Sequence, residues 1–67
     1  MIGAVKSYDG TRGIISPDLG GADIAVHASE VEYAGFARLT TGDRLSYDVK
    51  TDRALGRSFA VNLIRIN

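Results

Sequence analysis

The sequence predicts an all-β fold, a small antiparallel barrel of five strands, from three observations on its 67 residues. Turn-forming stretches recur along the chain: "YDG" at 8–10, "SPDLGG" at 16–21, "YAG" at 33–35, "TTGD" at 40–43 and "DRALG" at 52–56. The apolar segments between these turns are short, and several alternate between apolar and polar residues, which is typical of strands with one buried face. An open sheet in so small a chain exposes its edges, and closure into a barrel removes them.

Length and composition favour one compact domain over residues 1–67. A domain of this size buries only about 60% of its unfolded surface, and a hydrophobic fraction of 45% is enough for one small core. The chain has no cysteine, so neither a disulfide nor a thiolate metal site is expected. Eight Lys and Arg balance eight Asp and Glu, which argues against a strongly electrostatic nucleic-acid binder but leaves room for a local basic patch.

The first two strands are predicted to form a hairpin. Residues 2–8 are followed by Asp9-Gly10, which is a hairpin turn signal. The second strand then runs from about residue 12 to residue 16. It ends at Pro17, which cannot donate a hydrogen bond to a neighbouring strand.

Residues 23–27 are the predicted third strand, residues 43–50 the fourth and residues 57–66, approximately, the fifth. Between the third and fourth strands, residues 28–36 are predicted to form a helical turn, with Ser29 as its N-cap. Five short strands that close in this way are typical of an OB-fold barrel.

Alternation also predicts which side chains enter the core. The residues expected to face inward are Ile15, Ile24, Val26, Leu45, Tyr47 and Val49. The residues of strands two and three expected to face outward are Arg12, Ile14, Ser16, Asp23, Ala25 and His27. In strand five, Phe59 precedes Val61 and Leu63 at period two, which favours a core position for its ring.

Four stretches of the chain are "GAVK", "SPDLGGADIAVHAS", "GFARLTTGDRLSYDV" and "AVNL". They are similar in order and spacing to the patterns G-T-V-K, P-x-x-G-G-x-D-V-F-V-H-x-S, G-F-x-x-L-x-x-G-x-x-V-x-F and A-x-N-V. These are patterns of the bacterial cold-shock proteins, which the sequence therefore resembles over essentially the whole chain. The resemblance implies an OB-fold barrel that binds single-stranded RNA or DNA. It also implies that basic and aromatic side chains on strands one to three make the contacts.

The chain departs from the family pattern where the aromatic residues are expected. The pattern K-W-F is Lys6-Ser7-Tyr8 here, and "TRGI" before Ile15 stands in for K-G-F-G-F, with a first hairpin two residues shorter. On the simplest alignment, Arg12 and Ile14 occupy the two phenylalanine positions. Two alanines, at positions 25 and 28, replace further aromatic residues.

The resemblance implies a set of nucleic-acid-binding residues: Lys6, Tyr8, Arg12, Ile14, His27, Phe36 and Phe59. The Arg12 guanidinium is also able to stack on a base. Other interpretations stay open at this stage. Phe36 is either a stacking residue or a lid over one end of the barrel, and Phe59 is either core or a displaced aromatic platform. The cations Lys6, Arg12 and Arg57 form either a basic rim or a set of scattered solvated charges.

His27 is the single histidine of the chain. Its outward position argues against a core role, and without Cys or a second His it is a poor metal ligand. Catalysis requires a positioned partner, and no spacing in the sequence indicates a triad. Gly20-Gly21 is predicted to be a turn and not a phosphate loop. We therefore expect a nucleic-acid contact or a plain surface residue at position 27, and no enzyme, metal or cofactor.

The predicted function is weak binding of single-stranded RNA or DNA by a cold-shock-like protein that acts as an RNA chaperone or regulator. Losing three base stacks at about 1 kcal/mol each would weaken binding more than ~100-fold. The alternative is an OB-fold interaction module that has lost nucleic-acid binding and recognises a protein through the smooth surface at Ile14 and Ala25. No apolar stretch approaches the length of a membrane span and the N-terminus lacks a signal-peptide apolar region, so a cytoplasmic protein is expected.

Overall fold

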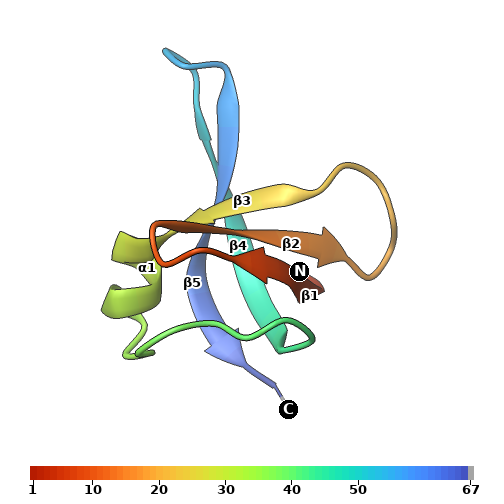
Figure 1. Ribbon diagram of the computed structural model, residues 1–67. Coiled ribbons are helices and arrows are strands. Elements are labelled where there is room, and N and C mark those ends of the chain that lie inside the picture. The colour runs from red at the N-terminus through yellow and green to blue at the C-terminus, as the bar shows by residue number, and fades with distance from the viewer. Residues whose placement is uncertain (67) are drawn as a thin grey trace.

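The computed structural model describes residues 1–66, which form five strands and one short helix (Figure 1). The elements in chain order are β1 (Ile2–Tyr8), β2 (Arg12–Pro17), β3 (Ile24–His27), α1 (Ala28–Tyr33), β4 (Arg44–Asp52) and β5 (Arg57–Arg65). The predicted order of elements is confirmed. The last residue of the predicted domain, Asn67, lies outside the described residues.

The five strands form one closed ring in the order β1-β2-β3-β5-β4. Strands β3 and β5 run parallel, whereas the other neighbouring pairs are antiparallel. Because the ring is closed, every strand has a neighbouring strand on both sides, and the exposed edges of an open sheet are removed. The predicted five-stranded barrel is therefore confirmed, with one parallel pair that places β5 beside β3.

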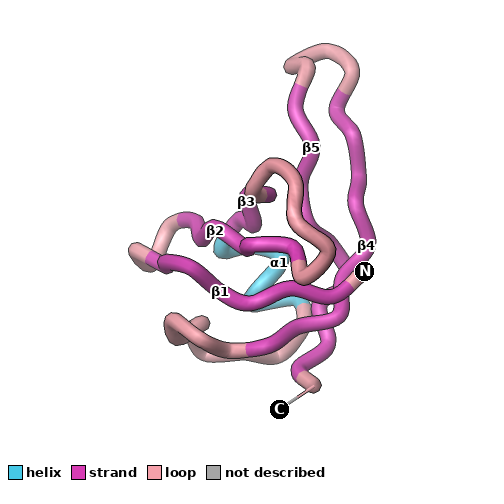
Figure 2. Tube along the Cα trace, turned by 90° about the vertical axis from the view of Figure 1, so that its right-hand side faces the viewer, coloured by secondary structure: helices cyan, strands magenta, loops and turns pink. Residues whose placement is uncertain are grey.

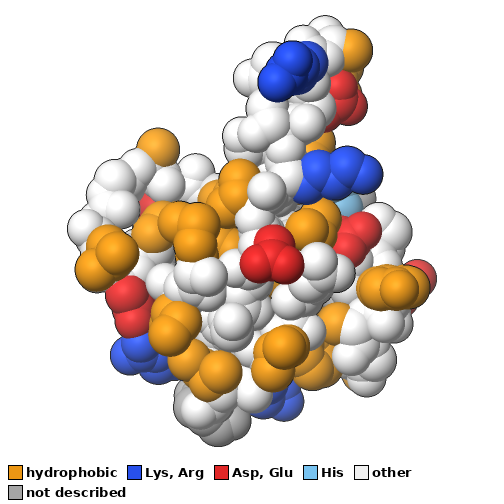
Figure 3. Space-filling model, turned by 180° about the vertical axis from the view of Figure 1, so that it is seen from behind, with side chains coloured by type: hydrophobic (Ala, Val, Ile, Leu, Met, Phe, Trp, Pro, Cys, Tyr) orange, Lys and Arg blue, Asp and Glu red, His pale blue; other side chains and the backbone are white. Residues whose placement is uncertain are grey.

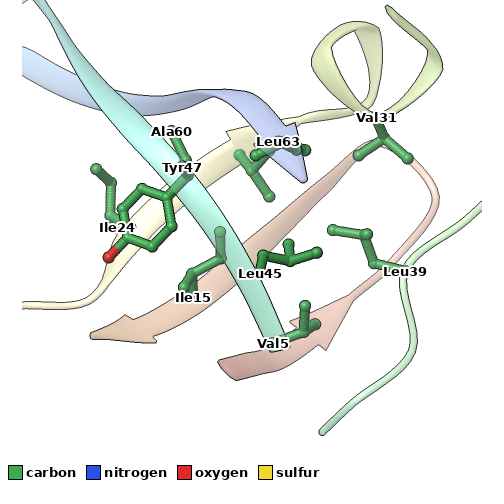
Figure 4. Packing of buried hydrophobic residues seen from close by; sticks show 10 residues of the cluster. Val5, Ile15, Ile24, Val31, Leu39, Leu45, Tyr47, Ala60 and Leu63 are labelled. Atoms are coloured by element: carbon green, nitrogen blue, oxygen red, sulfur yellow. The ribbon is translucent and has the colours of Figure 1, made fainter. Parts of the chain in front are cut away.

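The core fills the inside of this ring (Figure 4). Ile15, Val26 and Leu45 are fully buried, as alternation predicts, and Tyr47 lies among them with its ring almost completely covered. The Tyr47 hydroxyl has no hydrogen-bond partner among the described residues, and burial raises its pKa. Val31 of α1 and Leu39 of the following loop are buried with these residues, so the core continues beyond the strands.

Close packing of β1 against β2 requires a glycine at position 3. A Cβ atom built on Gly3 would lie 2.6 Å from Cγ2 of Ile15 and 2.7 Å from the backbone oxygen of Ser16. Both distances are far shorter than real van der Waals contacts. Any side chain here would push the two strands apart, so the glycine of the "GAVK" stretch has a packing role.

The prediction that Val49 faces the core is wrong, because this side chain is 41% exposed. Val49 pairs with the buried Ala60, but the neighbouring strand β1 pairs with β4 only as far as Ser46. Beyond that point the β4–β5 hairpin continues out of the barrel (Figures 1 and 2). We call residues 50–58 the arm. The alternation still places Val49 on the inward side of β4, but no strand on the opposite side of the barrel covers its side chain there.

The prediction that Phe59 belongs to the core is also wrong, since the buried positions of β5 are Ala60 and Leu63. The pairing shifts between Asp48 opposite Val61 and Ser46 opposite Ile64. At this shift Asn62 has a φ of 53°, in the left-handed region, which is typical of a β-bulge. The bulge reverses the alternation, so Phe59 faces away from the core although Leu63 faces toward it.

The helix begins one residue before the predicted N-cap. Its N-cap is His27, with no side-chain cap hydrogen bond, and Ser29 lies inside the helix. The backbone N–H of Ala28 donates to the carbonyl oxygen of Thr11 at 2.9 Å, so the contact with the start of β2 extends to the first residue of α1. His27 is thus held between a strand and a helix. Within residues 1–66, no helix is long and apolar enough to cross a membrane.

Candidate nucleic-acid interface

The outward side chains of β2, β3 and β5 form a shallow concave surface, which we call the binding face. Its lining residues are Arg12, Ile14, Asp23, Ala25, His27, Arg57, Ser58 and Phe59. The strand registers explain this set: Arg12 lies opposite His27, Ile14 opposite Ala25, and Ala25 beside Phe59. Four of the seven predicted binding residues, namely Arg12, Ile14, His27 and Phe59, therefore meet on one surface.

An aromatic pair lies at the centre of this surface. The rings of His27 and Phe59 have centroids 4.4 Å apart and planes inclined at 46°. His27 is exposed and Phe59 is half-buried, so part of each ring remains open to solvent. Because β5 is adjacent to β3, the Phe59 ring stands next to Ala25, where the family pattern expects an aromatic residue. The aromatic pair thus takes one ring from β3 and one from β5.

Arginines are the basic component of the binding face. Arg12 is the first residue of β2 and Arg57 is the first residue of β5. Both are exposed, and neither makes an ion pair or a side-chain hydrogen bond with another residue of the 1–66 segment. Two solvated guanidinium groups beside an aromatic pair are able to bind phosphates or to stack on bases.

Lys6 lies at the margin of the binding face. Its Nζ atom is 3.0 Å from Oδ2 of Asp23, which is one of the lining residues. The pairing between β1 and β2 shifts between Val5 and Ser7, so Lys6 occupies an irregular position in β1. Exposed pairs of this kind contribute little to stability, so Lys6 can exchange the carboxylate for a phosphate at small cost.

The shortened β1–β2 hairpin has a well-defined turn. Oδ1 of Asp9 accepts hydrogen bonds from the backbone N–H of Thr11 at 2.8 Å and of Arg12 at 2.9 Å. These hydrogen bonds lower the pKa of the Asp9 carboxyl. Gly10 has a φ of 93°, in the left-handed region that favours glycine. The turn fixes the start of β2, and so the shorter hairpin still places Arg12 opposite His27.

Tyr8 and Phe36 are not among the residues that line the binding face. Tyr8 packs against the core and lines a separate hollow with Asp9 and Arg38. Phe36 also packs against the core, and the guanidinium carbon of Arg65 lies 4.9 Å from its ring centre. The interpretation of Phe36 as a lid therefore agrees with its contacts. A stacking role for either ring stays a prediction.

Sequence reasoning missed one group of residues near the binding face. A second cleft adjoins His27 and Phe59 on the side of the arm, and its lining includes Glu30, Lys50 and Arg53. No motif identifies these residues, because the closure of the barrel is what brings α1 and the arm together. Among residues 1–66, no group of three or more His, Cys, Asp or Glu side chains is placed to hold a metal ion.

Comparison with known proteins agrees with this geometry. The family model described as "'Cold-shock' DNA-binding domain" matches residues 1–66. The chain is 44% identical to cold shock protein CspA of Rhizobium meliloti (strain 1021) and to a probable cold shock protein, y4cH, of Sinorhizobium fredii, with 91% of each chain covered in both cases. It is 35% identical to cold shock-like protein CspA of Rickettsia typhi, over 94% of this chain and 90% of that one.

Proposed function

This chain belongs to the cold-shock domain family, and we propose that it binds single-stranded RNA or DNA through the binding face on β2, β3 and β5. The observation that carries the proposal is the partly exposed His27–Phe59 pair together with Arg12 and Arg57, neither of which has an ion-pair partner among the described residues. Every base offers a π face, and such a surface binds single strands with little regard for sequence. The protein is thus a nucleic-acid-binding cold-shock-like protein.

The outward rows of side chains suggest how a strand would lie. One row runs from Ile14 through Ala25 to Phe59. Ile14 and Ala25 offer apolar contact without a ring, so a base stacks best at the Phe59 end of the row. Arg12, Arg57 and Lys6 lie around this row and supply positive charge for the phosphates between successive bases.

We propose that binding is weak and release is fast. The positions Ser7, Arg12, Ile14, Ala25 and Ala28 are those at which the family pattern expects aromatic residues. Each missing stack removes about 1–3 kcal/mol of binding free energy. The Phe59 ring and the Arg12 guanidinium recover only part of this sum. An RNA chaperone or regulator that must release strands quickly would tolerate the loss.

A titration of labelled oligo-dT and oligo-rU at several salt concentrations tests the proposal. If about three phosphates are neutralised, the logarithm of the affinity falls with the logarithm of salt concentration at a slope near −2. Lys6→Ala should flatten the slope by about 0.7, whereas the neutral change Ile14→Val should leave it unchanged. An absence of binding at low salt would contradict the proposal and favour a protein partner on the smooth surface at Ile14 and Ala25.

A further inference from the structure

The second cleft lies against the aromatic pair, between the first turn of α1 and the arm. It measures about 420 Å³ and shares the His27 and Phe59 rings with the binding face as a common wall. In the view from behind (Figure 3), the pale blue histidine lies near the base of the arm, with basic and acidic side chains next to it. A strand stacked on the aromatic pair would therefore reach this cleft with its next base.

The charges around the cleft differ from those of the binding face. Lys50 and Arg53 approach it from the arm, but Glu30 of α1 and Asp52 of the arm balance them, so the formal charge is zero with His27 neutral. A phosphate gains little in such a setting because the two carboxylates oppose it. A neutral group that both donates and accepts hydrogen bonds fits the cleft better.

Of the two carboxylates, Glu30 is the one available to a ligand. Oδ1 of Asp52 accepts from the backbone N–H groups of Ala54 at 3.0 Å and Leu55 at 3.2 Å, which hold the turn of the arm. Glu30 is half-buried and has no hydrogen bond or ion pair from its side chain to any other described residue. An ionised carboxylate only accepts hydrogen bonds, and so this wall of the cleft requires a donor.

Apart from the hydroxyl side chains of Ser29 and Thr51, the remaining lining of the cleft is apolar. The rings of the aromatic pair and the half-buried side chain of Val61 line it, and a flat ring is able to pack there. Adenine, cytosine and guanine each carry an exocyclic amino group that donates hydrogen bonds, whereas the one donor on this edge of thymine and uracil is the ring N3–H, which is flanked by two carbonyl oxygens. A Glu30 carboxylate that accepts from this N3–H would lie beside both carbonyl oxygens, which repel it, so an exocyclic amino group is the better donor.

We propose that the second cleft binds one nucleobase that carries an exocyclic amino group, with the Glu30 carboxylate as acceptor and the Phe59 ring as stacking surface. The inference rests on the proposed function, because the base must arrive on a strand held by the binding face. It gives the protein a preference for adenine, cytosine or guanine at one position of an otherwise unspecified single strand.

The test compares oligo-dT with a series in which one thymine at a time is replaced by 5-methylcytosine. This change replaces the O4 carbonyl with an amino group and the N3–H donor with a nitrogen acceptor, and it keeps the methyl group and the ring size. We expect fluorescence anisotropy to show roughly threefold to tenfold tighter binding at one position of the series, as for one typical hydrogen bond at a solvent-accessible site. Glu30→Gln should remove most of that preference and leave binding of plain oligo-dT unchanged or slightly tighter.

Glu32→Gln is the matched control, since Glu32 lies on the same helix but lines the hollow near Tyr8 instead of the cleft. It should keep the preference in full. A measurement on the unmodified protein removes any dependence on the folding of the variants. The 5-methylcytosine oligonucleotide should shift the NMR amide signals of Ser29, Thr51 and Val61 more than oligo-dT does.

Equal affinity for every member of the series would overturn the inference, as would a preference that survives Glu30→Gln. Shifts confined to β2 and β3 would overturn it too. In each case the proposed function stands, provided that oligo-dT still binds with a clear salt dependence. If no oligonucleotide binds, both the proposed function and the inference fail.

Discussion

The barrel wall at β2 and β3 and the arm at β4 and β5 follow the same two-residue alternation with different outcomes. In β2 and β3 the inward positions Ile15 and Val26 are completely buried. In β4 the inward position Val49 is 41% exposed, because β1 stops pairing with β4 at Ser46. Alternation shows which face of a strand a side chain occupies, but burial also requires an opposite wall.

The two regions also divide the functional surface between them. The β2–β3 region keeps His27 but has Arg12, Ile14 and Ala25 where the resemblance expects aromatic rings. The β5 region supplies the ring of Phe59, which contacts the ring of His27 on the neighbouring strand β3. The aromatic pair therefore joins a ring of β3 to a ring of β5, which is not one of the strands one to three that the resemblance assigns to binding.

The largest effect should come from truncating the same residue type in the two regions. Val26→Ala removes two methyl groups from a fully buried position and should destabilise the fold by about 1–3 kcal/mol. Val49→Ala removes the same atoms from the exposed base of the arm and should change stability by less than about 0.5 kcal/mol. Urea unfolding of both variants measures the difference. Equal losses would show that the arm folds back over Val49 in solution.

Restoring rings to the barrel wall is the second test. Ile14 and Ala25 are partners across β2 and β3 and are both half-buried on the outward side. The double variant Ile14→Phe with Ala25→Phe should tighten binding of oligo-dT by about 10-fold or more, since each stack is worth about 1–3 kcal/mol. Double-stranded DNA should gain nothing, because its bases are already stacked. A folded double variant that binds no better would indicate that strand geometry, and not missing rings, limits affinity.

The third test removes one ring from each of two sites. Phe59→Ala should weaken oligo-dT binding by about fivefold to tenfold, as for the loss of a partly exposed stack, with a small effect on stability. Phe36→Ala should mainly reduce stability and have only a small effect on oligo-dT binding. The Phe36 ring packs against the core and beneath Arg65, so its loss should lower the free energy of unfolding. Oligo-dT titration and urea unfolding of both variants distinguish these outcomes. If Phe36→Ala abolishes binding of a stable protein, Phe36 is a stacking residue.

The sequence predicts the barrel well because its turns and its inward residues are local signals. The "YDG" turn, the start of β2 and the core positions Ile15, Val26 and Leu45 follow from a few neighbouring residues. The position of Phe59 depends on the bulge at Asn62, and no local pattern reveals a single left-handed asparagine. The second cleft depends on residues of β3, α1, β4 and β5, which meet only when the ring closes. The errors at Val49 and Phe59 therefore concern the pairing between strands, whereas the error at the Ser29 N-cap is a local shift in the start of the helix.

The smallest expected effect concerns the turn that positions Arg12. The Asp9 carboxylate accepts two backbone hydrogen bonds that lower its pKa below the ordinary value of about 3.9. A carboxyl with a lowered pKa in the folded state contributes stability that is fully present above the unfolded value and is lost as pH falls through the folded value.

Asp9→Asn keeps an acceptor oxygen without a titrating charge. The wild-type protein should therefore be slightly more stable than Asp9→Asn from pH 5 to pH 7, and this difference should shrink below about pH 4. Urea unfolding of both proteins across these pH values measures the difference in their free energies of unfolding. The contributions of the carboxyl groups that both proteins share cancel in this difference. A difference that stays constant with pH would mean that the turn does not depend on the charge of Asp9, and that Gly10 alone sets the short hairpin that places Arg12 beside His27.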